Sequence, residues 1–165
     1  GTGAPDWAAY HGVTLPQQPN TSAVQKDDSL VAKLSHQELL ILSDLGVTST
    51  QIERLEDSPI AAQTYALPRA DSHCWLAVTG NQAAEMFSKI CAVDLRAHKF
   101  ANGEVAQTSV ARANSIVIRH DLGSTPCFYV LTDASATEFL WDCLLDAMAE
   151  YTGAPVGVSA LRTLS

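Results

Sequence analysis

Three short β-rich runs follow one another between residues 104 and 132, and no other feature of the chain limits the possible folds as much. Turn-like residues, at Ala113-Asn114 and at 121–126, separate the runs, which cover 104–112, 115–120 and 127–132. Consecutive runs of this length with short turns between them are typical of neighbouring antiparallel strands. The sequence therefore predicts an antiparallel meander in the second half of the chain.

Helical patterns flank this meander on both sides. A buried strand is predicted at 72–79, and a helix at about 82–91, where apolar residues recur at the spacing of one helical face. A second helix, 135–151, starts with the Ser-x-x-Glu pattern of a capping box and is followed by a glycine. With a returning strand at 155–161, this order predicts the split βαβ arrangement of ferredoxin-like α+β domains with an antiparallel sheet.

The first 29 residues have a different character. Three of the chain's seven prolines fall there, and the apolar residues follow neither a helical nor a two-residue period. Residues 1–29 are therefore predicted to be an extended arm. Trp7 and Tyr10 are too apolar for a purely solvated tail, so the arm is expected to lie along its own globule or along a partner. Disorder is the other interpretation that the composition leaves open.

From residue 30 onward the apolar content rises. Two short strands are predicted at 30–34 and 38–42, and a short helix at 50–55. Residues 30–165 are predicted to form a single α+β domain, because the sequence contains no fixed-period repeat and no low-complexity tract.

Composition excludes several classes of protein. In 165 residues, no apolar run reaches the ~18 residues that a membrane-spanning helix needs, so a membrane protein is not expected. The formal net charge of −8, with the basic residues scattered, argues against nucleic acid as a partner. The four cysteines show no CxxC spacing and lie in apolar segments, which favours reduced, buried thiols and a cytoplasmic location.

A search for catalytic groups yields no constellation. Asp71, His73 and Cys74 are close in sequence, but neighbouring residues on a strand point to opposite faces, so a His73–Cys74 nucleophile pair is not expected. The five histidines show no zinc-ligand spacing, and no glycine-rich phosphate loop is present. The sequence predicts no catalytic residue and no metal site.

One surface pattern lies on the second predicted helix. Acidic residues recur there every four positions, at Glu138, Asp142, Asp146 and Glu150. A solvated helix face is the default explanation, because like charges at this spacing weaken an isolated helix only slightly. A docking surface for a basic partner is the alternative, since such a partner would offset the repulsion.

The segment 67–153 resembles the γ subunits of heterotetrameric sarcosine oxidases. The elements that carry this resemblance stand in order along the chain: WLAVTG at 75–80, CAVDL at 91–95, GEVAQT at 103–108 and FLWD at 139–142. No single motif is specific, but the ordered series is. The γ subunits resemble a trimmed folate-binding domain of the glycine cleavage T-protein, so the resemblance implies an aminomethyltransferase folate-binding-domain-like fold.

The resemblance also implies a function. It points to a noncatalytic γ subunit of a flavin-dependent complex that demethylates sarcosine to glycine and transfers the one-carbon unit to tetrahydrofolate. The expected partners are the α, β and δ subunits, and FAD, FMN, NAD, tetrahydrofolate and zinc are expected there, with no cofactor on this chain. T-protein relatives place a catalytic carboxylate near residues 115–119, and the corresponding run here, 112–119, contains no acid.

Two alternatives remain open. The first is a small folate-binding protein or an aminomethyltransferase-like transferase. If a folate-like pocket is retained, Arg112, Asn114 and Arg119 are the polar groups expected to line it, because they flank the strand that carries chemistry in the relatives. The second is a γ-like subunit of a related oxidase or dehydrogenase that acts on another N-methyl amino acid.

Overall fold

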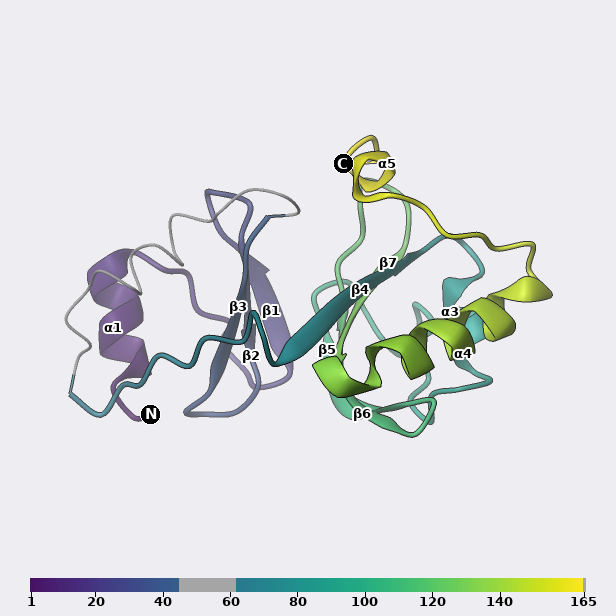
Figure 1. Cartoon of the computed structure of the whole chain (residues 1–165). Helices are drawn as coiled ribbons and strands as arrows, with labels where there is room; N and C mark the ends of the chain where they lie inside the picture. Colours follow the sequence, from purple (N-terminus) through teal and green to yellow (C-terminus); the bar gives the residue numbers. More distant parts are fainter. Residues whose placement is uncertain (45–61, 165) are drawn as a thin grey trace. The chain divides into compact units, whose positions relative to one another are not determined.

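The computed structural model describes residues 1–44 and 62–164, and the chain divides into two compact units, Gly1–Pro68 and Arg69–Ser165 (Figure 1). Each unit contains its own antiparallel sheet. This division differs from the predicted one, in which an arm of 29 residues precedes a single domain. The first 29 residues belong to the first unit, because they contribute a helix, a strand and part of a core. The helix predicted at 50–55 lies outside the described residues.

The described residues of the first unit, 1–44 and 62–68, form one helix and three strands. Helix α1 is Ala4–His11, and the strands are β1 (Thr21–Val24), β2 (Leu30–Lys33) and β3 (Leu39–Leu42), in the order β1-β2-β3. The strands predicted at 30–34 and 38–42 are therefore confirmed.

Two features explain why a proline-rich segment folds as part of this unit. Pro5 lies in the first turn of α1, where a missing N–H costs nothing, and Gly12 ends the helix in the left-handed conformation with φ of 67°. Trp7 is only 4% exposed and packs with Ala8, Val13 and Val31. The segment is anchored by this contact with β2, which its local sequence pattern does not reveal.

The second unit is built on a four-stranded sheet. Its strands are β4 (His73–Thr79), β5 (Val105–Val110), β6 (Ala113–Arg119) and β7 (Cys127–Asp133), in the order β4-β7-β6-β5 with every pair antiparallel. The α+β class with an antiparallel sheet and the predicted meander are both confirmed. The first turn of the meander, however, is Ala111-Arg112 rather than Ala113-Asn114, because Val110 pairs with Ala113.

Short helical elements accompany this sheet. They are α3 (Ala83–Phe87), the 3₁₀ turn η1 (Ala134–Ala136), α4 (Thr137–Ala149) and α5 (Val158–Leu161). The helix at 82–91 is confirmed in place but is shorter. The predicted capping box is wrong, because Asp133 provides the cap: its carboxylate accepts bonds from the backbone N–H and the hydroxyl of Ser135, at 2.8 and 2.5 Å.

The predicted returning strand at 155–161 is also wrong. The segment contains α5 and pairs with no strand of the described part of the chain. Pro155 and Gly157 explain this, since proline cannot donate to a ladder and glycine weakens a strand. Without that strand, the sheet of the second unit has four strands, each antiparallel to its neighbours. Among the described residues, no helix is long and apolar enough to cross a membrane.

Helices α3 and α4 cover one face of the second sheet. Figure 1 shows α4 running across the sheet with α3 beside it. The core between them includes Phe87 from α3, Leu140 and Leu144 from α4, and Val117 and Val130 from the sheet, all at most 2% exposed. This packing places the amino-terminal half of α4 beside the Ala111-Arg112 turn.

Candidate functional site

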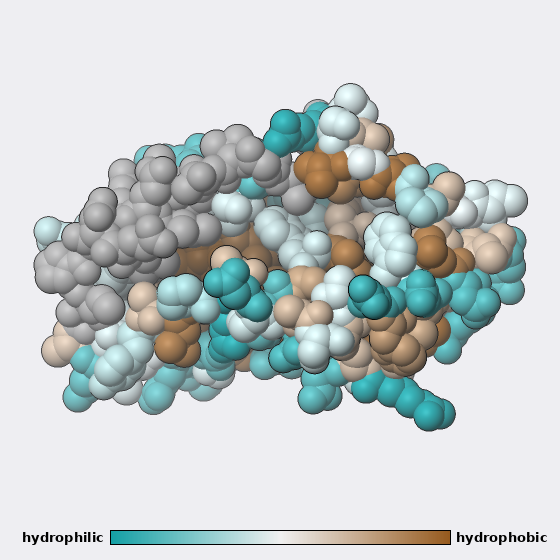
Figure 2. All heavy atoms as spheres, in the orientation of Figure 1, coloured by the Kyte–Doolittle hydropathy of each residue, from teal (hydrophilic) through white to brown (hydrophobic). Residues whose placement is uncertain are grey.

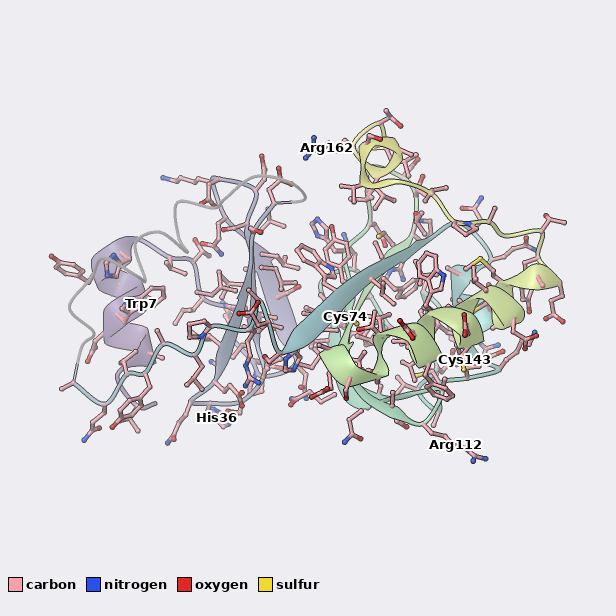
Figure 3. The ribbon with its side chains drawn as sticks, in the orientation of Figure 1. Trp7, His36, Cys74, Arg112, Cys143 and Arg162 are labelled. Atoms are coloured by element: carbon pink, nitrogen blue, oxygen red, sulfur yellow. The ribbon has the colours of Figure 1, made fainter. Side chains whose placement is uncertain are left out.

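An open groove of about 560 Å³ lies where the β5–β6 turn meets α4 and the segment that follows α3. Figure 3 shows two of its residues, Cys143 on α4 and Arg112 below it. The floor and walls are mainly apolar, and the charged residues are Lys89 and Arg112. The complete lining is Lys89, Ile90, Cys91, Ala92, Ala111, Arg112, Phe139 and Cys143. We refer to this feature as the Arg112 groove.

The turn that carries Arg112 has an unusual backbone. Ala111 and Arg112 both have positive φ, 48° and 67°. Two-residue hairpin turns of this kind normally use glycine or asparagine, because a Cβ in the left-handed region costs roughly 1–2 kcal/mol. The N–H of Ala111 donates to the Ile90 carbonyl at 2.8 Å, and Val110 bridges to Cys91. Contacts with the segment after α3 therefore hold a conformation that the local sequence disfavours.

The two cations of the groove have different surroundings. The Lys89 ammonium donates to the Ala147 carbonyl at 3.1 Å, lies 3.4 Å from a Glu150 carboxylate oxygen and sits 6.0 Å from the centre of the Tyr151 ring. Hydrogen bonds from Tyr151 and Lys89 hold the pKa of Glu150 below its usual value. Arg112 is exposed, and its guanidinium contacts no partner among the residues that the structure describes. Arg112 therefore supplies the groove's available positive charge.

Asn114 lies elsewhere. Its side chain is exposed and lines a second open cavity of about 530 Å³, together with His73, Gln107 and neutral residues of β5, β6 and β7. The backbone carbonyl of Asn114 accepts a bond from the Thr132 hydroxyl at 2.8 Å. This cavity contains polar groups but no carboxylate, lysine or arginine.

Arg119 is buried and fully committed to the fold. It is 8% exposed, and its Nε and Nη2 atoms both donate to the carboxylate of Asp121 at 2.9 Å, while Nη1 donates to the Phe100 carbonyl at 2.7 Å. The guanidinium also lies 5.9 Å from the centre of the Phe128 ring. Arg119 thus holds two loops together and is not available to a ligand.

The three residues predicted for a folate-like pocket are therefore not brought together. The strand between Arg112 and Arg119 is about 23 Å long at roughly 3.3 Å per residue. Asn114 faces a different cavity from Arg112. Arg112 remains a candidate binding residue, but the residues that share its groove, such as Lys89 and Phe139, were not predicted from the sequence.

Comparison with known proteins identifies the family. Residues 9–165 match the family described as the GCVT N-terminal domain. The chain belongs to this family. Two aminomethyltransferases are similar to it: that of Acidobacterium capsulatum is 27% identical over 84% of this chain, and that of Koribacter versatilis is 24% identical over 88%. The chain spans 37% and 38% of the length of these two relatives.

A solved structure agrees with this assignment. A chain of the heterotetrameric sarcosine oxidase from Corynebacterium sp. U-96, in complex with pyrrole 2-carboxylate, is 26% identical and matches with a TM-score of 0.78. The match covers 95% of this GCVT-family chain and 78% of that chain. The predicted resemblance to sarcosine oxidase and to an aminomethyltransferase-like domain is thereby confirmed.

One buried thiol of this GCVT N-terminal domain, Cys127, is held in its neutral form. Burial, and then the negative charge of Asp121, raise the pKa of Cys127 to about 12. Cys74 and His73 are adjacent on β4 and so point to opposite faces, while the His73 Nδ1 lies 2.9 Å from the Ser72 hydroxyl. Among the described residues, no group of three metal-ligating side chains comes together.

Of the residues predicted to bind partners, one is buried and the others are exposed. Trp7 is buried inside the first unit, in agreement with the expectation that the arm lies along its own globule, whereas Tyr10 is 82% exposed. On α4, Glu138, Asp142 and Asp146 are exposed, and Glu150 pairs with Lys89. Figure 2 shows hydrophilic and hydrophobic residues next to each other over α4.

Among the residues that line the Arg112 groove, sequence reasoning named only Arg112 as a site residue, and Lys89 and Phe139 are the most important of those it missed. Lys89 follows α3, and Phe139 lies in the first turn of α4, 55% exposed. Phe139 gave one signal, because it widens the apolar stripe of α4 beyond the face that a core helix needs. Nothing in the local sequence connects Lys89 with the β5–β6 turn, since the two meet only through tertiary packing.

Proposed function

We propose that this chain is a noncatalytic subunit, of the γ type, in a heterotetrameric, flavin-dependent sarcosine oxidase. The observation that carries the proposal is the match to a chain of such an enzyme over 95% of this chain at a TM-score of 0.78. The complex would demethylate sarcosine to glycine and transfer the one-carbon unit to tetrahydrofolate. The α, β and δ subunits would hold FAD, FMN, NAD, tetrahydrofolate and zinc.

The surface of the chain supports a role in assembly. Phe139 and Trp141 are 55% and 40% exposed on α4, although aromatic side chains of this size contribute strongly when an interface buries them. The acidic residues Glu138 and Asp142 flank these two aromatic residues in the sequence and are exposed. We expect this mixed surface of α4 to contact another subunit.

Affinity capture of the tagged full-length chain from its own cells tests the proposal. We expect large polypeptides to co-purify in fixed stoichiometry, with the visible absorption spectrum of a flavin and with sarcosine oxidation activity. Recovery of the chain alone and colourless, at near-physiological salt, would overturn the proposal. Mass identification of the co-purifying chains would show whether they correspond to the other three subunits.

A second candidate function is reduced-folate binding by the chain itself. The family match and the similarity to two aminomethyltransferases favour it. The absence of an acid between Arg112 and Arg119 argues against one-carbon transfer but not against binding. Calorimetric titration of the isolated chain with tetrahydrofolate separates the two candidates, because only this one predicts saturable binding without partners.

A related oxidase or dehydrogenase of another N-methyl amino acid would use the same subunit. Substrate choice would then reside in the flavin-bearing subunit. Assaying the captured complex with sarcosine and with other N-methyl amino acids distinguishes the two, since the preferred substrate has the higher kcat/KM.

A further inference from the structure

We propose that the Arg112 groove receives a carboxylate side chain of a partner subunit together with an apolar side chain beside it. This inference rests on the proposed function, because it names the chemistry of the partner segment that the subunit binds. The occupant is a polypeptide segment in which Asp, Glu or a C-terminal carboxylate lies within a few residues of an aliphatic or aromatic residue.

The charge of the groove specifies a single carboxylate. Lys89 is already engaged by Glu150 and by the Ala147 carbonyl, whereas Arg112 contacts no partner within the described part of the chain. One free guanidinium offers one bidentate site for a planar carboxylate. A ligand with several carboxylates would leave the others unmatched, against a chain whose formal net charge is −8.

The remaining surface of the groove specifies an apolar neighbour for that carboxylate. The neutral residues of the lining include Ile90, Cys91, Ala92 and Ala111, and also Phe139, whose surface is 55% exposed. A small-molecule site normally encloses most of its ligand, but this groove is open. An open apolar floor with an exposed aromatic residue and a free arginine is instead typical of one side of a protein interface.

The backbone adds an independent reason. Ala111 and Arg112 occupy left-handed conformations that glycine or asparagine would adopt without strain. Strained backbone of this kind is concentrated at functional sites, where it sets the direction of a side chain. Here the strained turn places Arg112 in the lining of the groove.

Charge reversal in the full-length chain tests the proposal on the captured complex. We expect Arg112→Glu to weaken binding to the purified partner subunits about tenfold or more, measured as Kd, and Phe139→Ser to weaken it as well. Arg69→Glu is the matched control, because Arg69 is exposed outside the groove and the net charge changes equally. Equal effects of Arg112→Glu and Arg69→Glu would overturn the proposal, since only long-range charge would then matter.

Photo-cross-linking identifies the occupant. With p-benzoylphenylalanine at position 139, we expect cross-links to a partner segment that contains a carboxylate, and replacing that carboxylate by Lys should restore binding to Arg112→Glu. Cross-links to a basic segment, to a second copy of this chain or to no protein would overturn the inference. Saturable binding of benzoylglutamate to the isolated chain, lost in Arg112→Glu, would indicate a small-molecule site and also overturn it.

These outcomes are separate from a failure of the proposed function. If a complex forms but is indifferent to Arg112→Glu, the groove proposal fails and the subunit role stands. If no complex is recovered with the unaltered chain, both fail.

Discussion

Arg112 and Arg119 lie at opposite ends of the same strand, β6, and their side chains differ in burial and in hydrogen bonding. At one end Arg119 is buried against Phe128 and forms three hydrogen bonds with Asp121 and Phe100. At the other end Arg112 is exposed on a strained turn and contacts no partner among the described residues. The hydrogen-bond partners around each guanidinium, and not its position in the strand, therefore decide whether it stabilises the fold or is available to a ligand.

Removing the buried arginine should have the largest effect. We expect Arg119→Ala to lower the free energy of unfolding by about 3–5 kcal/mol, because it leaves the Asp121 carboxylate, 18% exposed, without its partner. Urea-induced unfolding of the full-length chain measures the loss. Arg112→Ala is the matched control and should change stability by less than about 0.5 kcal/mol. Similar losses in the two variants would break the comparison.

Two thiols, one near each end of β6, should differ strongly in their rate of alkylation. Cys127 lies beside Asp121 with a pKa of about 12, whereas Cys143 lines the Arg112 groove and is partly exposed. At pH 8, we expect iodoacetamide to modify Cys143 at least about a hundredfold faster than Cys127, since the thiolate is the reactive form. Peptide mass spectrometry gives the rates. Comparable rates would show that the Arg119 region opens readily to solvent.

The raised pKa of Cys127 also predicts that the stability of the fold depends on pH. Because the folded-state pKa of Cys127 lies above its ordinary value of 9.0, the stability from its neutral thiol is complete below that pH. It is lost as the pH rises toward about 12. We expect Cys127→Ala to show a weaker fall in Tm over this range, and an identical fall would contradict the assignment.

Relieving the strained turn should have a smaller, stabilising effect. We expect Arg112→Gly to raise the free energy of unfolding by about 0.5–1 kcal/mol, because glycine adopts φ of 67° without strain, although it gains more entropy on unfolding. Ala113→Gly, at the neighbouring position of β6, should destabilise by a similar amount, since its φ is not positive. If the Arg112→Gly chain is more stable but binds its partner poorly, the Arg112 side chain contributes to binding and not to the stability of the fold.

Asp133 provides an intermediate case, an exposed charge with local partners. Hydrogen bonds from the Ser135 hydroxyl and backbone N–H hold its pKa below the usual value of 3.8. A lowered folded-state pKa contributes stability above that pH, and this is lost as the pH falls. We therefore expect Asp133→Ala to lower Tm slightly at pH 7 and to lower it less at pH 2. Asp142→Ala, with the same change of charge on α4, should leave Tm unchanged at both values.

Much of the second unit could be predicted because its elements are encoded locally. The β-rich runs between residues 104 and 132, and the helical period after residue 135, depend on neighbours in the sequence. The Ala111-Arg112 turn was placed two residues too late, since neither residue favours positive φ. The cap was assigned to Ser135 because the Ser-x-x-Glu pattern is common, whereas in the structure the carboxylate of Asp133 accepts a bond from the Ser135 backbone N–H.

By itself, the sequence determined the α+β class, the meander, the strands at 30–34 and 38–42 and the resemblance to sarcosine oxidase subunits. Only the tertiary structure decided that Trp7 is a core residue, that Arg119 is structural and that Arg112 shares a groove with Lys89 and Phe139. The physical reason is the range of the interactions involved. Periodicity acts between residues a few positions apart, whereas burial and ion pairing depend on residues that meet only when the chain has folded.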